Sequence, residues 1–396
     1  MIVRMDGLTS TVRRLGWPGP IACMLTGVAL SFMAPSLRIL VTPELVLLVL
    51  LPGLVFEGAY RLHWEDLVRS YGSIAFLAVP GVIISAAIVA LGLWAVTGLR
   101  PELAFVVGAM VSATDPAAVI ATFTRLRAPR RLIAIVDAES LLNDGTGLVL
   151  FAVAIAVVSR DIAPTEAVWL FGWTIAGSVA LGAGAGFAAS LGVVHAPSRG
   201  LAVALTVLCA YGTYLVAATL GLSGVLASVI AGIVLGNHGR HIGLTEATER
   251  AFDAVWEPLA ALLTALIFLA VGVAIGRSGA LEALAPIAWG VLFVLIARGV
   301  VVYALIGGAL AVLGRRRGGP ALPAGWLHPL FWAGLRGGVA TAAALSLPLD
   351  FPDRDLLQRI TFGVVVVTLL LQGSTASWLV RRIPPGDQPA STLRTT

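Results

Sequence analysis

The chain has 396 residues, of which 58% are hydrophobic and only 12% are charged, and its mean hydropathy is +0.96. Soluble domains carry about 25% charged residues, so this composition excludes a soluble protein and indicates a polytopic membrane protein with no separate soluble domain. The formal net charge of +5 comes from arginines in short loops, which suit an anionic membrane surface and give no reason to expect a nucleic acid partner.

The predicted elements are all helices. Spans of about 20 apolar residues match a hydrocarbon core of roughly 30 Å, and about 12 such segments follow one another with short polar turns between them. They run approximately over residues 20–34, 43–60, 71–97, 102–124, 132–158, 165–193, 200–220, 222–236, 254–276, 280–312, 327–347 and 356–380.

Arginines supply all 26 basic residues, and their placement predicts the orientation. If the N-terminus is cytoplasmic, 18 arginines lie on that side and six on the other, in agreement with the positive excess of cytoplasmic loops. We therefore predict a single transmembrane domain over residues 1–396, with a short cytoplasmic lead at 1–16 and a short cytoplasmic tail at 383–396. The last two arginines, Arg298 and Arg336, lie inside apolar segments, where a buried guanidinium needs a partner.

Two early segments carry a carboxylate. Glu57 lies near the predicted cytoplasmic end of the second segment, where it either simply reaches water or joins a polar site. In the fourth segment, Pro116 removes a backbone donor in mid-span and leaves carbonyls without partners, which predicts a broken helix. Asp115 precedes this proline, and its carboxylate can cap the second half-helix, bind an ion, or do both.

The fifth segment contains the densest polar cluster, Glu139-Ser140-Leu141-Leu142-Asn143-Asp144. At about 100° per residue, its four polar side chains share one face of a helix. Each charged side chain at bilayer depth costs roughly 2.5 to 3.5 kcal/mol on insertion scales, so intramembrane carboxylates usually face a pathway or a partner. This face is predicted to point to protein or water, and Asp144 and Asp115 are predicted to come close enough to share a cation.

The late segments offer partners for these groups. Arg298 in the tenth segment is predicted to pair with Glu139, which would leave Asp144 as an unpaired carboxylate. Arg336 in the eleventh segment is flanked by three glycines within five residues, which weaken a helix and predict a second break. One interrupted span in each half of the chain suggests inverted repeats. Cys23 and Cys209 have no metal-type spacing, and we interpret both as packing residues.

Several of these motifs together resemble the Na+/H+ exchanger branch of the monovalent cation:proton antiporters. The resemblance lies in Thr114-Asp115-Pro116, Glu139-Ser140-Leu141-Leu142-Asn143-Asp144 and Gly334-Leu335-Arg336-Gly337, with Phe56-Glu57-Gly58 and Arg298 in the expected order, and it covers nearly the whole chain. It implies an antiporter fold in which two broken helices cross, a homodimer in the cell membrane, and alternating access. It implies a transporter and no enzyme, with no cofactor besides the transported cation and proton, and a role in pH homeostasis.

The resemblance also implies roles for single residues. Na+ would bind at Asp144, Asp115, Ser140 and Thr114, with Asn143 beside it and Glu57 adding an oxygen, while Glu139 and Arg298 form a structural ion pair and Arg336 supplies charge at the broken helices. An Asn-Asp pair in place of Asp-Asp is typical of electroneutral exchange. Relatives carry an apolar helix before Trp17 that this chain is predicted to lack, which a truncated start would explain.

Other interpretations stay open. K+/H+ exchange is the main alternative to Na+ or Li+, because selectivity depends on cavity size and ligand number that no motif records. An intramembrane aspartyl protease is a distant alternative, since Asp115 and Asp144 lie on adjacent spans, but the flanking residues lack that family's patterns. A passive channel would need neither a buried ion pair nor two broken spans.

Overall fold

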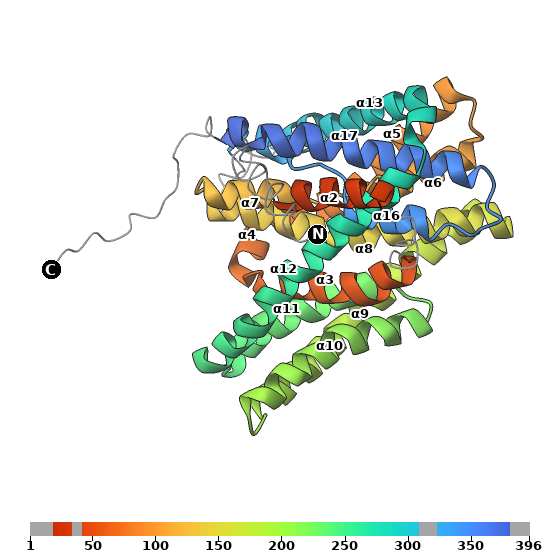
Figure 1. Cartoon of the computed structure of the whole chain (residues 1–396). Coiled ribbons are helices and arrows are strands. Elements are labelled where there is room, and N and C mark those ends of the chain that lie inside the picture. Colours follow the sequence, from red (N-terminus) through yellow and green to blue (C-terminus); the bar gives the residue numbers. More distant parts are fainter. Residues whose placement is uncertain (1–18, 34–41, 309–322, 381–396) are drawn as a thin grey trace.

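The computed structural model describes residues 19–33, 42–308 and 323–380, and this part of the chain contains helices and no strands. The predicted lead at 1–16 and tail at 383–396 lie outside the described residues. Within the described residues, seven helical spans are long and apolar enough to cross a membrane. Figure 1 shows them as a bundle, with α9 and α10 at one edge and α13 and α17 at the opposite edge.

The helices follow one another with short connections. Their bounds are α2 Gly19–Met33, η3 Leu45–Leu50, α3 Leu51–Arg61, α4 Trp64–Ala78, α5 Pro80–Thr97, α6 Pro101–Met110, α7 Ala117–Arg125, α8 Arg130–Arg160, α9 Pro164–Val194, α10 Arg199–Thr219, α11 Gly224–Ile242, α12 Glu246–Arg277, η4 Ala280–Ala283, α13 Leu284–Gly299, η5 Val300–Gly307, η6 Ala324–Trp326, α15 Leu327–Trp332, α16 Gly338–Leu345 and α17 Arg354–Val380. The elements η3 and η5 are π-helices that continue into α3 and follow α13, respectively.

The all-α prediction is confirmed, and each predicted apolar segment overlaps a helix of the structure, although the number of membrane crossings is not fixed by the helices alone. The third predicted segment is two helices, because Pro80 opens α5 directly after α4 ends. The fourth and eleventh predicted segments are each interrupted, between α6 and α7 and between α15 and α16. Both interruptions lie where proline and glycine predict them.

Close packing of long helices holds the bundle together. Helix α2 packs along α12, and helix α11 packs along α3. A Cβ added at Gly27 would lie 2.2 Å from the carbonyl oxygen of Leu269, and one at Gly272 would lie 2.0 Å from that of Met24. Small residues at such positions let two backbones approach, which is how helices associate when the surrounding lipid is equally apolar.

The two interruptions meet each other in space. The Asp115 amide donates to the Leu335 carbonyl at 2.9 Å, which joins residues from the two broken segments. Each interruption is also held by the long helix that follows it. Asn143 of α8 accepts from the Thr114 amide at 3.1 Å, and Thr368 of α17 accepts from the Arg336 amide at 3.2 Å. This correspondence between the two halves is what inverted repeats predict.

Candidate ion-binding site

The Asp115 side chain connects the two broken segments where they meet. One carboxylate oxygen accepts a hydrogen bond from the Ala117 amide at 3.2 Å, and the other accepts from the Gly338 amide at 3.1 Å. These amides belong to the first residues of α7 and α16, so one side chain caps both helices, where a negative charge also meets the positive ends of two helix dipoles. Gly337 makes room for this arrangement, because a Cβ there would lie 2.1 Å from the Asp115 carboxylate.

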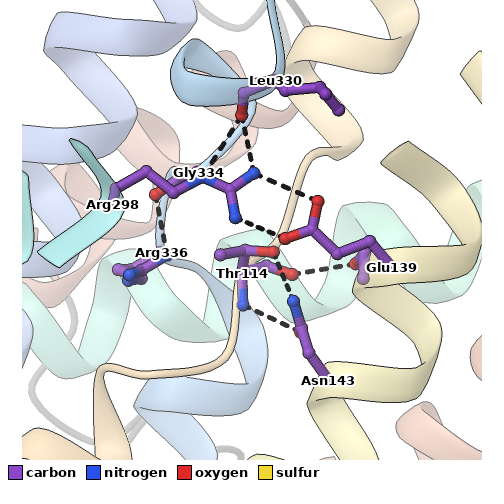
Figure 2. Close-up of polar contacts among 8 residues, drawn as sticks. Thr114, Glu139, Asn143, Arg298, Leu330, Gly334 and Arg336 are labelled. Atoms are coloured by element: carbon purple, nitrogen blue, oxygen red, sulfur yellow. Dashed lines mark hydrogen bonds and ion pairs between the residues drawn. The ribbon is translucent and has the colours of Figure 1, made fainter. Parts of the chain in front are cut away.

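The polar face of α8 lies against Thr114. Ser140 donates its hydroxyl hydrogen to the Thr114 carbonyl at 2.8 Å, and the Asn143 amide group donates to the Thr114 hydroxyl at 2.7 Å. Asn143 also accepts from the Thr114 backbone amide, as described above. Figure 2 shows these contacts between α8 and the extended stretch that links α6 to α7. They satisfy backbone groups that the missing helical turn leaves without partners.

Glu139 and Arg298 form a bidentate ion pair beside the crossing (Figure 2). Glu139 is 1% exposed and Arg298 is 4% exposed, so the pair is almost completely desolvated. Arg298 also donates to the Leu330 carbonyl through Nε at 3.2 Å and Nη2 at 2.6 Å. Gly334 borders the guanidinium, and a Cβ at this position would lie 2.6 Å from Arg298 Nε.

Arg336 lies in the second interruption and is 1% exposed. Its Nη1 donates to the Gly334 carbonyl at 2.8 Å, and its Nε has no hydrogen-bond partner in the described part of the chain. Gly334 lies two residues after the end of α15, where helix carbonyls have no intrahelical donors and the dipole is negative. The positive charge of the Arg336 guanidinium therefore offsets the negative dipole end of α15 inside the bundle.

A cavity of about 560 Å³ opens beside the crossing and contains Asp144. The Asp144 side chain is 8% exposed, and its Oδ1 has no hydrogen-bond partner among the described residues. A buried carboxylate without a donor carries a large desolvation cost, which binding of a proton or a cation relieves. Asp144 is therefore the group in this cavity that is best placed to bind either one.

The structure separates the predicted site residues into two groups. Asp144, Asp115, Ser140 and Glu57 line the cavity, whereas Thr114 and Asn143 do not. The Asn143 side-chain amide instead donates a hydrogen bond to the Thr114 hydroxyl. Glu57 lies on α3 and forms an ion pair with Arg61, one turn later on the same helix.

Glu139, Arg298 and Arg336 also lie outside the cavity lining. Their contacts hold the helices around the cavity and leave its interior to other side chains.

Besides the predicted residues, the cavity lining contains polar side chains that the sequence did not assign to the site, among them Arg61 at the end of α3. Asp137 lies seven residues before Asp144 on α8, Thr264 lies on α12, and Cys23 lies on α2. Asp137 has a signal in the sequence, because a spacing of seven residues places it on the same helix face as Asp144. Cys23 packs against the hydrophobic core as predicted and also borders the cavity, while the other cysteine, Cys209, is buried in a core cluster. Thr264 gives no signal within its apolar segment.

Comparison with known families identifies the chain. The model of the family "Sodium/hydrogen exchanger, transmembrane" matches residues 2–382. The chain belongs to this family. It is a multi-pass membrane protein, and the family resemblance inferred from its motifs is confirmed.

Curated relatives and a solved structure agree with this assignment. The Na(+)/H(+) antiporter NhaP of Pseudomonas aeruginosa is 36% identical over 357 residues, covering 87% of this chain and 82% of that protein. The low-affinity Na(+)/H(+) antiporter NhaS1 of Synechocystis is 34% identical over 380 residues, covering 94% and 71%. The structure of the sodium proton antiporter MjNhaP1 from Methanocaldococcus jannaschii at pH 8 matches with a TM-score of 0.75 at 20% identity, covering 96% of both chains. The antiporter fold is therefore shown.

Proposed function

We propose that this protein is a secondary-active antiporter that exchanges Na+ or Li+ for H+ across the cell membrane by alternating access at Asp144. The observation that carries the proposal is the buried Asp144 carboxylate, which faces a cavity and has no donor to its Oδ1 in the described part of the chain. Relatives that are 30 to 36% identical over most of the chain are Na(+)/H(+) antiporters, which supports the choice of substrate.

The coupling follows from competition at one carboxylate. A proton and a cation each neutralise Asp144, and occupancy by one excludes the other, so transport of one ion in each direction becomes obligatory. Hard oxygen ligands suit Na+ and Li+, and the cavity offers oxygens from Ser140, Glu57 and Thr264 besides Asp144. Asp115 adds a charged group at the cavity wall, although both of its oxygens already accept hydrogen bonds.

Exchange is measured in proteoliposomes that contain a pH-sensitive dye. A preformed pH gradient should dissipate when Na+ or Li+ is added, and Asp144→Asn should abolish the response. Asp161→Asn is the matched control, because Asp161 lies exposed at the other end of α8 in a left-handed conformation that asparagine tolerates. If the pH gradient dissipates only when K+ is added, the transported cation is K+ and not Na+. If no alkali cation dissipates the gradient in the wild type, the proposal is contradicted.

We further propose that the exchange is electroneutral. Asn143 carries no charge and hydrogen-bonds Thr114, so Asp144 is the carboxylate of this pair that can trade one proton for one cation. The initial rate of Na+-driven proton movement should therefore not change when valinomycin and a K+ gradient impose a membrane potential. A rate that rises or falls with the imposed potential would show that net charge moves in each cycle.

The orientation and the assembly are also proposals. Arg61 ends α3, Arg130 begins α8 and Arg240 lies near the end of α11, all at one end of the bundle. The usual excess of arginines on cytoplasmic loops supports a cytoplasmic location for this end. A reporter that is active only in the cytoplasm should then be active when it is fused after residue 396. A reporter that is active only outside the cytoplasm should be inactive at the same position. The resemblance implies a homodimer, which mass measurement of the detergent-solubilised protein tests directly.

A further inference from the structure

A second cavity shares part of its lining with the candidate ion-binding cavity. This vestibule has a volume of about 1130 Å³ and lies between the start of α4, the start of α8 and the end of α11. In the described part of the chain, two residues line both cavities, namely Arg61 of α3 and Asp137 of α8. We call these two side chains the neck, because they lie where the vestibule borders the cavity that contains Asp144.

Helix α8 places charged groups along the two cavities. Arg130 lines the vestibule, Asp137 lines the neck and Asp144 lines the inner cavity, and each lies seven residues after the one before. Seven residues turn a helix by about 700°, almost two full turns, and advance it by about 10.5 Å. The three side chains therefore lie on one face of α8, and Asp137 lies between Arg130 in the vestibule and Asp144 in the inner cavity.

Charges of both signs surround the neck, with Glu65 and Asp66 on the vestibule wall beside its arginines. The vestibule is lined by Arg61, Arg130 and Arg240. Arg240 pairs with Glu249 at 2.8 Å, and Arg61 pairs with Glu57, whereas no hydrogen bond or ion pair engages Asp137 among the described residues. Asp137 is therefore a carboxylate that lies at the neck and remains available to a passing cation.

We propose that Asp137 is a transit site, which binds a partly hydrated alkali cation at the neck and passes it on to Asp144. The unpartnered Asp144, 92% buried at the end of the same cavity, marks the destination of that cation. The inference rests on the proposed cation/proton exchange and extends it to the route of access. Without the Asp137 carboxylate, Arg61 is the remaining side chain that lines both cavities, and its positive charge lowers the local cation concentration there.

The test compares Na+-dependent exchange by the full-length wild type, Asp137→Asn and Asp137→Glu in proteoliposomes. Asp137→Asn should raise the KM for Na+ about fivefold, which corresponds to about 1 kcal/mol, and should change the maximal rate less than KM. Asp137→Glu keeps the charge and should restore the wild-type KM. If Asp137→Asn does not insert into the membrane, Asp137→Ser also removes the charge, with a smaller side chain. Its KM for Na+ is then compared with that of the wild type in the same way.

Two further variants separate electrostatics at the neck from other causes. Asp66→Asn removes an equal charge from the vestibule wall outside the neck, so it should leave KM unchanged. The double variant Asp137→Asn/Arg61→Gln also removes the positive charge at the neck and should recover most of the affinity for Na+. A purely structural role for Asp137 predicts no such recovery.

The proposal is overturned if Asp137→Asn keeps the wild-type KM, if Asp66→Asn raises KM equally, or if the maximal rate falls at an unchanged KM. A wild-type protein that exchanges no alkali cation would contradict the proposed function instead. The two failures are therefore distinguishable in one set of vesicles.

Discussion

The buried pair of Glu139 and Arg298 is the strongest candidate for a single interaction on which the bundle depends. Replacing Arg298 with methionine would leave the Glu139 carboxylate without its cation and would remove two hydrogen bonds to the Leu330 carbonyl. Loss of one partner from a buried ion pair costs about 3 to 5 kcal/mol, because the remaining charge stays desolvated. That is a large part of the roughly 5 to 15 kcal/mol by which native proteins are stable.

The effect is measured as thermal stability of the detergent-solubilised protein. A loss of about 4 kcal/mol should lower the midpoint by roughly 5 to 10 °C, since each kcal/mol shifts a protein of more than 200 residues by about 2 °C. Glu139→Gln should have a similar effect, because it leaves the Arg298 guanidinium buried without an anion. The double variant Glu139→Gln/Arg298→Met removes both charges and should lose about as much stability as one single variant, not the sum.

A double variant whose loss equals the sum of the two single losses would refute this reasoning. Additivity would mean that the two side chains do not interact energetically, although the structure places them in contact. A shift below about 1 °C for Arg298→Met would also contradict it, because a desolvated carboxylate without a partner cannot be neutral in cost. Gly184→Ala serves as the control, since a Cβ at Gly184 has open space within 4 Å.

Two further predictions concern the crossing and the cavity. Gly337→Ala should abolish exchange, because its Cβ would lie 2.1 Å from the Asp115 carboxylate and force the two caps apart, whereas Gly184→Ala should exchange normally; equal rates for both variants would contradict the close fit. A cationic methanethiosulfonate reagent should modify Cys23, which lines the cavity, and inhibit exchange, while Cys23→Ser should be resistant. Buried Cys209 should contribute little, so inhibition that persists in Cys23→Ser would contradict this assignment.

The sequence alone was sufficient to predict the elements that depend on local chemistry. Pro116 predicts a broken helix because it removes a donor wherever it stands in a span. The polar face of α8 follows from helical spacing and from the cost of burying charge in a membrane. These arguments need no knowledge of neighbouring helices, and the structure has the break and the shared face where they were predicted.

The remaining details depend on contacts between distant parts of the chain. The sequence suggested that Asp115 caps α7, but its second oxygen accepts from Gly338, 223 residues later. The glycines around Arg336 were interpreted as helix breakers, but Gly334 and Gly337 are also needed because side chains of other segments lie against them. Whether Cys23 faces a cavity or a neighbouring helix is likewise decided by the packing of α2, and no local pattern records it.

The arrangement of charges explains why the Asp144 carboxylate remains available at the inner end of the polar face of α8. The core of the bundle contains acidic groups whose charge is already balanced, since Glu139 pairs with Arg298 and Asp115 accepts from two helix N-termini. These balanced groups fix the two crossing segments and the start of the polar face of α8. Asp144 is one helical turn beyond Ser140 on that fixed face, where its Oδ1 has no donor in the described structure. The balanced charges of Glu139 and Asp115 thus fix the helices, and the Asp144 carboxylate lies at the cavity with no donor to its Oδ1 in the described residues. Under this condition a proton and a cation compete for the same carboxylate.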